Sequence, residues 1–170
     1  MAPSLPTAAL LLTIAAVTPA QGPYVFGDSL SYDGRLYAVI GAPGQPYVGG
    51  RYSDGPVYAE QLAAATGRTL YDFAIPGATT TDVLTTQVMP LLAGSPSGLP
   101  GNGLYVYWAG ANDLFELLSA PAGNPQQVIT NAMNETATAL GSLISQGAQD
   151  IVVLNLPDLS LTPWVIGLND

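Results

Sequence analysis

The stretch that decides the fold is YVFGDSL, residues 24–30, where a run of β-favouring residues stops at a glycine and a polar turn. A short apolar run closed by turn residues is typical of a strand buried in a sheet. Two further runs of this kind, residues 69–74 and 104–109, are also followed by glycine-containing turns. A fourth run, residues 151–155, is apolar up to its final asparagine. These runs predict four strands.

Segments with helical spacing separate the predicted strands. Residues 53–56, Ser-Asp-Gly-Pro, offer a capping side chain and a first-turn proline. Tyr58, Leu62 and Ala65 then share one face of the helix that we expect. A threonine-rich start at residues 79–82 predicts the next helix, which leads into a second apolar segment.

The clearest helix is predicted after Asn124, whose side chain can cap it, with Pro125 in the first turn. Its apolar face recurs at steps of four and three residues, at Ile129, Met133, Thr136, Leu140 and Leu143. Strands that alternate with helices predict an α/β fold, a three-layer α/β/α sandwich around a parallel sheet. The run at residues 151–155 has the composition of a parallel strand buried on both faces.

The balance of charges excludes one class of partner and disfavours another. Lys and Arg together number 3 against 12 Asp and Glu, which gives a formal net charge of −9. Nucleic acid would be repelled because too few cations are present to replace its counterions. Anionic membrane surfaces are disfavoured for the same reason. The sequence has no cysteine, so it can form no disulfide and no thiolate metal site.

The N-terminus carries an apolar run at residues 8–17. This is the length of the core of a signal peptide and is well short of the roughly 20 residues that span a membrane. Small residues follow it up to Ala20. We therefore expect residues 1–20 to be a signal peptide, residues 21–170 to form the domain, and the protein to be secreted without a transmembrane segment.

Three of the predicted strands end in polar or glycine-containing turns: Gly27-Asp28-Ser29-Leu30, Pro76-Gly77 and Gly110-Ala111-Asn112-Asp113. The carboxyl ends of parallel strands meet at one rim of a sheet, where ligands bind. At that rim Ser29 offers a hydroxyl, and Gly77 offers an N–H that no side chain shields. With the Asn112 carboxamide and the Ser29 N–H, these groups can form an oxyanion hole for acyl transfer. Asp28 is expected to organise its turn by hydrogen bonding.

These turns resemble the first three conserved blocks of the GDSL, or SGNH, hydrolase superfamily of lipases and esterases. The resemblance extends over nearly all of residues 24–163. It implies that Ser29 is the nucleophile, and that the backbone N–H groups of Ser29 and Gly77 and the amide of Asn112 form the oxyanion hole. It also implies a parallel sheet with a further, fifth strand, a lipid or carbohydrate ester as substrate, and no metal or organic cofactor. No Gly-x-Ser-x-Gly elbow is present, which counts against the α/β-hydrolase fold.

One departure from the family concerns the catalytic base. A serine hydroxyl needs a neighbouring base to become a nucleophile, and the family supplies a histidine in a late Asp-x-x-His block. The sequence contains no histidine, and the family's fifth strand, last helix and Asp-His loop are absent. Asp158 is a poorly matched substitute, since the pKa of a carboxylate lies far from that of a hydroxyl. Two explanations remain open: a fragment, which we expect, or a complete protein that has lost catalysis.

The same residues also allow interpretations in which they take no part in catalysis. Ser29 could cap a first helix, and Asn112-Asp113 could cap the helix that follows the third strand. The whole domain could be a non-catalytic binding module for carbohydrate or lipid, or a flavodoxin-like binder of a small ligand. For the ester-hydrolase interpretation, we expect little or no hydrolysis by these 170 residues alone.

Overall fold

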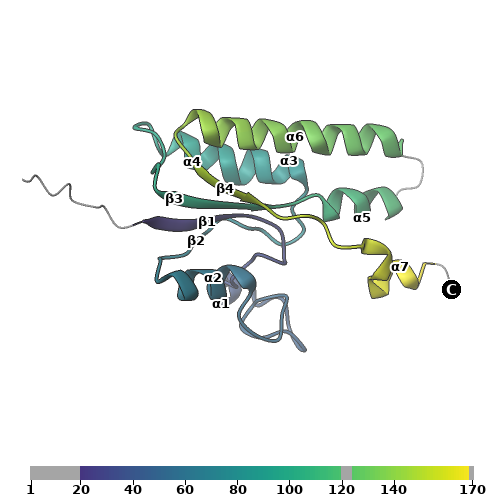
Figure 1. Ribbon diagram of the computed structural model, residues 1–170. Helices are drawn as coiled ribbons and strands as arrows, with labels where there is room; N and C mark the ends of the chain where they lie inside the picture. The colour runs from purple at the N-terminus through teal and green to yellow at the C-terminus, as the bar shows by residue number, and fades with distance from the viewer. Residues whose placement is uncertain (1–19, 120–123, 169–170) are drawn as a thin grey trace, which may run out of the picture.

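The computed structural model describes residues 20–119 and 124–168, so nearly all of the predicted signal peptide lies outside it. Four parallel strands form one sheet in the order β2-β1-β3-β4 (Figure 1). The strands are β1 (Gln21–Gly27), β2 (Tyr71–Asp72), β3 (Gly103–Trp108) and β4 (Asp150–Val153). The predicted α/β fold with a parallel sheet is confirmed.

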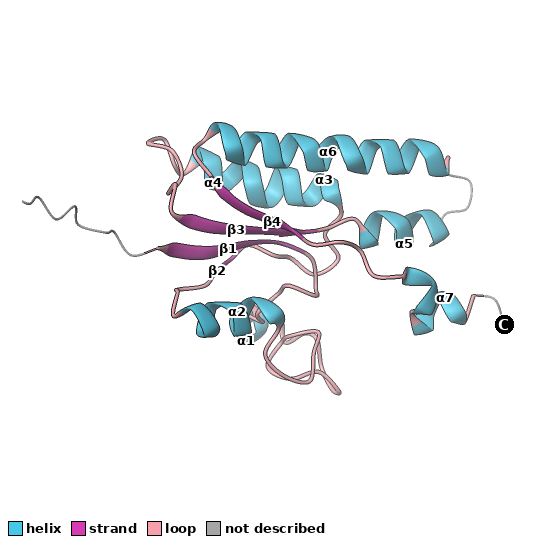
Figure 2. Cartoon of the chain, in the orientation of Figure 1, coloured by secondary structure: helices cyan, strands magenta, loops and turns pink. Residues whose placement is uncertain are grey.

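Helices cover both faces of the sheet, which confirms the predicted three layers (Figure 2). One face carries α1 (Tyr37–Ile40) and α2 (Tyr58–Thr66). The other carries α3 (Thr80–Asp82), the π-helical segment η1 (Val83–Val88), α4 (Met89–Ala93) and α6 (Pro125–Ser145). The remaining elements are α5 (Ala111–Ser119) after β3, and η2 (Leu159–Leu161) and α7 (Pro163–Ile166) after β4. Within the described ranges, no helix is long and apolar enough to cross a membrane.

The two central strands, β1 and β3, organise the core. Their side chains alternate between the two faces of the sheet, so each helical layer has its own apolar cluster. Phe26 and Tyr107 face η1 and α6 and pack with Leu143. Val25 and Val106 belong to the cluster on the α2 side. This burial fixes the ends of both strands, from which the predicted site extends.

The ends of two helices show which local predictions hold. Asn124 caps α6, because its Oδ1 accepts hydrogen bonds from the N–H groups of Gln126 (3.0 Å) and Gln127 (3.4 Å). At α2 the predicted cap is wrong. The helix begins after Val57, and the Glu60 carboxylate, in the first turn, accepts from the Val57 N–H at 3.0 Å. A long acidic side chain in the first turn thus replaces the expected Ser or Asp.

The predicted apolar face of α2 is also displaced. Ala59 and Ala63 are buried, Tyr58 and Leu62 are partly buried, and Ala65 is exposed. The two alanines allow the helix backbone to lie close to the sheet, and the larger residues pack beside this line of contact. Spacing identified the helix correctly, but residue size set its orientation.

The prediction that the fourth strand is buried on both faces is wrong. β4 is an edge strand of the sheet, and Val152 and Val153 are 42% and 49% exposed. The facing half of α6 is similarly open, with Ile129 41% and Met133 67% exposed, whereas Leu143 towards its other end is buried. The apolar run therefore predicted the strand correctly, but it did not predict how far other elements cover the strand.

Candidate active site

The three predicted turns meet at the carboxyl-end rim of the sheet. The Asn112 side chain joins them: its Nδ2 donates to the carbonyl oxygen of Ala78 at 2.9 Å and lies 3.4 Å from Asp28 Oδ2. Asp28 and Ala78 are the chain neighbours of Ser29 and Gly77. One amide thus connects the two turns that hold the predicted nucleophile and the predicted glycine donor.

The turn after β1 is built around Asp28. This residue is 4% exposed, and its Oδ1 accepts from the Leu30 N–H at 2.9 Å, which confirms that it organises the turn. Burial raises the pKa of Asp28 above its ordinary value. Ser29 is half-buried, and neither its hydroxyl nor its N–H bonds to another residue in the described part of the chain. No helix begins at Ser29, so the capping interpretation is wrong, and α1 starts only at Tyr37.

The turn after β2 leaves its backbone open at Gly77. Gly77 has φ +81°, a left-handed conformation that favours glycine, and no atom lies within 4 Å of the position that a Cβ would take. The N–H of Ala78 closes the turn by donating to the carbonyl of Ile75 at 3.1 Å. The Gly77 N–H donates to no other described residue. This N–H is therefore not used by the described part of the chain, and no side chain of Gly77 itself shields it.

The turn after β3 runs directly into α5, and its polar residues make tertiary contacts. Asp113 accepts from both the N–H (3.0 Å) and the hydroxyl (2.6 Å) of Thr80. The Thr80 hydroxyl also lies 2.7 Å from Glu135 Oε2 on α6. Because Asn112 and Asp113 bind residues more than 30 positions away, the interpretation of this pair as a simple helix cap is wrong.

Sequence reasoning missed an ion pair between the partly exposed Arg35 and the buried Asp72 that supports the rim. Asp72, at the end of β2, accepts from the Asp33 N–H at 2.8 Å and from Arg35 Nη1 at 3.3 Å. Arg35 Nη2 also donates to the carbonyl of Ala74 at 2.7 Å. Burial raises the pKa of Asp72 to about 7, although its backbone hydrogen bonds and Arg35 oppose this shift. An acidic residue within a predicted strand was the available sequence signal.

Several hollows border the rim, and two of them lie next to proposed catalytic groups. One, of about 290 Å³, lies beside the Ser29 turn and is lined in part by Leu30, Tyr52, Tyr58 and Trp108. Tyr58 packs edge-on against Trp108, with ring centroids 5.4 Å apart. The tyrosine hydroxyl lies 3.1 Å from Ser31 Oγ, and burial raises its pKa to about 12.

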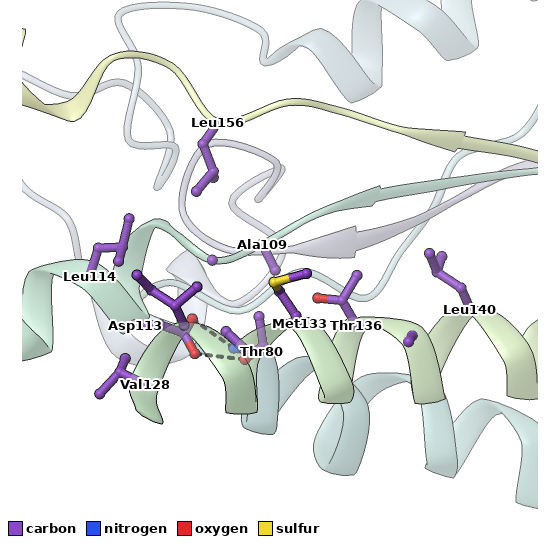
Figure 3. A pocket seen from close by; sticks show the side chains of 13 residues that line it. Thr80, Ala109, Asp113, Leu114, Val128, Met133, Thr136, Leu140 and Leu156 are labelled. Atoms are coloured by element: carbon purple, nitrogen blue, oxygen red, sulfur yellow. Dashed lines mark hydrogen bonds between the residues drawn. The ribbon is translucent and has the colours of Figure 1, made fainter. Parts of the chain in front are cut away.

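The second hollow is an apolar groove of about 420 Å³ between α5, α6 and the segment after β4 (Figure 3). Leu114, Met133, Leu140 and Leu156 line it, and the hydrogen bonds between Thr80 and Asp113 lie at its floor. Gly110, two residues before Asn112, also belongs to its lining. The groove therefore places apolar surface next to the predicted oxyanion donor.

Comparison with known proteins identifies the same family that the three turns resemble. The family model described as "GDSL-like Lipase/Acylhydrolase" matches residues 24–170. The chain belongs to the GDSL-like lipase/acylhydrolase family. The resemblance that the three turns carried is thereby confirmed, and the predicted classes of ester hydrolysis and acyl transfer are those of this family.

Relatives of this GDSL-family chain include enzymes that act on esters and one secreted effector. Lipase 1 of Photorhabdus luminescens is 31% identical over 92% of this chain and 26% of its own length. A phosphatidylcholine-sterol acyltransferase of Aeromonas hydrophila is 30% identical over 82% of this chain and 45% of its own. The secreted effector protein SseJ of Salmonella typhimurium is 28% identical over 82% and 35%. The chain thus spans less than half the length of each of these relatives.

Potential metal ligands do not gather anywhere in the part of the chain that the structure describes. No group of three or more His, Cys, Asp or Glu side chains there could hold an ion. The acidic residues nearest to the rim are instead engaged by donors from the protein, as Thr80 shows for Asp113 and Glu135.

Proposed function

We propose that this chain carries the nucleophile and the oxyanion-binding groups of a carboxylic-ester hydrolase, with Ser29 as nucleophile. The observation that carries the proposal is the position of the Asn112 amide between Asp28 and Ala78, which holds the Ser29 and Gly77 turns together. Family membership supports ester hydrolysis or acyl transfer as the reaction class.

In the proposed reaction, Ser29 Oγ attacks the ester carbonyl carbon while a base takes the hydroxyl proton. The carbonyl oxygen becomes an oxyanion, which accepts hydrogen bonds from the N–H groups of Ser29 and Gly77 and from Asn112 Nδ2. For this bond, one Nδ2 hydrogen leaves its long, 3.4 Å contact with Asp28 Oδ2, while the other stays on the Ala78 carbonyl. Collapse of this intermediate expels the alcohol and leaves an acyl group on Ser29. Water then attacks the acyl carbon, and Ser29 leaves as a hydroxyl, so an acid and an alcohol are the products.

The base is the component that these 170 residues do not supply, since the sequence contains no histidine. Asp158 is unsuitable, because hydrogen bonds from Ser160 lower its carboxyl pKa further and make it a weaker base. We therefore expect the chain alone to hydrolyse esters slowly or not at all. A base from solution should restore the first chemical step if the other groups are in place.

Three observations support an apolar ester substrate outside the cell. The groove beside Gly110 offers apolar surface next to Asn112. Two relatives are named as a lipase and a phosphatidylcholine-sterol acyltransferase, and a third as a secreted effector. The apolar run at residues 8–17 supports export. We propose a secreted protein that acts on lipid-like esters.

The test is labelling of Ser29 by a fluorophosphonate in the presence of imidazole. Imidazole takes the proton, Ser29 Oγ bonds to phosphorus, and fluoride leaves. Peptide mass spectrometry should find the adduct on Ser29 in the unmodified sequence, with far slower labelling when imidazole is omitted. Ser29→Ala should lose the adduct, whereas Ser95→Ala, which changes a serine in the turn after α4 that is half-buried like Ser29, should keep it.

A non-catalytic binding module is the second candidate, favoured by the lack of histidine. It predicts a folded chain whose Ser29 reacts with the fluorophosphonate no faster than the other serines of the chain, with or without imidazole. That result would remove the hydrolase proposal.

A further inference from the structure

A buried glutamine on the helical layer binds the backbone directly before the nucleophile turn. Gln87 is 1% exposed. Its Oε1 accepts from the Gly27 N–H at 2.9 Å, and its Nε2 donates to the Gly27 carbonyl at 2.8 Å. The carboxamide and the residue thus form a closed pair of hydrogen bonds across 60 positions of sequence.

Gln87 reaches Gly27 from the π-helical segment η1. There the Met89 N–H donates to the carbonyl of Leu84, five residues back, rather than four. Val83, Gln87 and Val88 are the buried residues of this segment. Single π-turns inside α-helices are frequent at functional sites, because the extra residue redirects a side chain. Here the redirected side chain is a carboxamide that meets the end of β1.

Gly27 needs a partner because its strand neighbour ends early. β2 stops at Asp72, although the N–H groups of Phe73 and Ile75 still donate to the carbonyls of Val25 and Gly27, at 2.8 and 3.1 Å. In a regular parallel ladder, a carbonyl of the adjacent strand would accept from the Gly27 N–H. Gln87 Oε1 takes that place. A buried N–H left without an acceptor would cost about 1–3 kcal/mol.

We propose that Gln87 is a positioning residue for Ser29. Gly27 lies two residues before Ser29, so any rotation of the Gly27 backbone moves both the Ser29 hydroxyl and the Ser29 N–H. The glycine is also held from its other side, since a Cβ on Gly27 would collide with the carbonyl oxygen of Trp108 on β3. On the β2-facing side, Gln87 binds both the N–H and the carbonyl of Gly27, and it shares the carbonyl with the Ile75 N–H. The expected effect of Gln87 on the reactivity of Ser29 rests on the proposed function, whereas its expected effect on the Gly27 backbone does not.

The first test compares Gln87→Met with Val88→Ala. Methionine keeps the length of the side chain and loses both hydrogen bonds, and Val88 is a fully buried neighbour on the same segment that does not bind Gly27. Chemical denaturation gives the stability lost by each variant. Loss of global stability alone raises the exchange rate of a buried N–H by a calculable factor. In Gln87→Met, the exchange rate of the Gly27 N–H should exceed that factor by more than about tenfold. Imidazole-assisted labelling of Ser29 should fall by about tenfold or more, because a displacement of about 1 Å can cost about 10²-fold.

Val88→Ala serves as the control for packing alone. It should slow the labelling of Ser29 by less than about twofold, since its hydrophobic loss does not reach Gly27. Equal effects of both variants on Gly27 exchange and on labelling, after correction for stability, would overturn the proposal. If Ser29 is not labelled in the unmodified chain, the proposed function fails. The Gly27 exchange rate then still decides whether Gln87 holds this backbone.

The second test uses Gln87→Glu and the pH. An ionised glutamate accepts from the Gly27 N–H but cannot donate to the Gly27 carbonyl, whereas a protonated glutamate does both. Burial raises the pKa of such a carboxyl above its ordinary value. The labelling rate of Gln87→Glu, divided by that of the unmodified chain at the same pH, should rise as the pH falls through this pKa. A ratio that does not change with pH would show that only the volume of Gln87 matters.

Discussion

The rim of the sheet and its outer edge are organised in opposite ways. At the rim, comprising residues 27–31, 75–80 and 109–113, buried polar groups are hydrogen-bonded to partners from distant parts of the chain. At the outer edge, comprising β4 and the exposed side chains of α6 outside the groove, apolar residues such as Val152 and Ile144 are exposed. The hydrogen-bonded turn after β3 and the exposed side chains of β4 thus belong to neighbouring strands.

This difference indicates that the proposed site depends mainly on the central strands of the sheet, β1 and β3. β1 and β3 are buried by helices on both faces, and the turns that follow them carry Ser29 and Asn112. The third proposed donor, Gly77, follows the edge strand β2, and Asn112 ties its turn to the centre of the sheet through Ala78. β4 supplies none of the three proposed oxyanion donors. Changes at the rim should therefore alter the reactivity of Ser29, and changes at the edge should not.

The largest effect is expected from Asn112→Ala. Loss of one oxyanion donor typically costs about 10²–10³-fold in rate, and this amide also joins two turns. Imidazole-assisted labelling of Ser29 should fall by about that factor. Ile144→Ala, a 60% exposed residue on α6, is the edge control and should label at the normal rate. Comparable labelling of the two variants would contradict the comparison.

The next effect concerns two valines that are paired across the sheet. Val106 of β3 lies opposite Val152 of β4, and they are 1% and 42% exposed. Val106→Ala should lower the free energy of unfolding by about 2 kcal/mol, through lost burial and a cavity. Val152→Ala should lower it by less than about 1 kcal/mol. Urea denaturation measures both, and equal losses would show that the edge is as ordered as the centre.

A smaller effect is expected where Thr80 joins α3 to α5 and α6. Thr80→Val removes the hydroxyl that contacts Asp113 and Glu135, which should lower the free energy of unfolding by about 1.5 kcal/mol. Thr86→Val is the matched control, because Thr86 is exposed and bonds only to the helix carbonyl of Asp82. Its effect should stay within about 0.5 kcal/mol. If Thr80→Val loses as little stability as the control, the Thr80 hydroxyl does not stabilise the contact of α3 with α5 and α6.

The smallest effect is a pH dependence from Asp28. Burial raises its pKa in the folded chain, so the folded state binds this proton more tightly than the unfolded state does. The resulting stability is present below the ordinary value of 3.8 and is lost as the pH rises through the folded pKa. Asp28→Asn does not titrate, and its Oδ1 can still accept from the Leu30 N–H. The unfolding free energy of the unmodified chain, relative to this variant, should therefore decrease as the pH rises above about 4.

Sequence reasoning predicted the architecture because strands and turns leave local signals. The β1 run, the glycine-marked turns and the Asn124 cap all depend on residues close together in the chain. The convergence of Ser29, Gly77 and Asn112 followed from one rule, that parallel strands share a carboxyl-end rim. Their proposed roles came from the family resemblance and remain a proposal.

The features that were missed depend on contacts between distant residues. The hydrogen bonds of Gln87 to Gly27 need a π-turn. Pro90, which follows η1 in the same run of helix, signals an irregular helix there but not which side chain the irregular turn redirects. The true face of α2 depends on how closely alanines can approach the sheet. The exposure of β4 depends on its place at the edge of the sheet, which its apolar composition does not reveal.

The most direct test of the central claim is a crystal structure of the chain after reaction of Ser29 with a fluorophosphonate. The account predicts a phosphoryl oxygen at about 2.7–3.1 Å from the backbone nitrogens of Ser29 and Gly77 and from Asn112 Nδ2. A phosphoryl oxygen that points into solvent, with these three donors turned elsewhere, would contradict it.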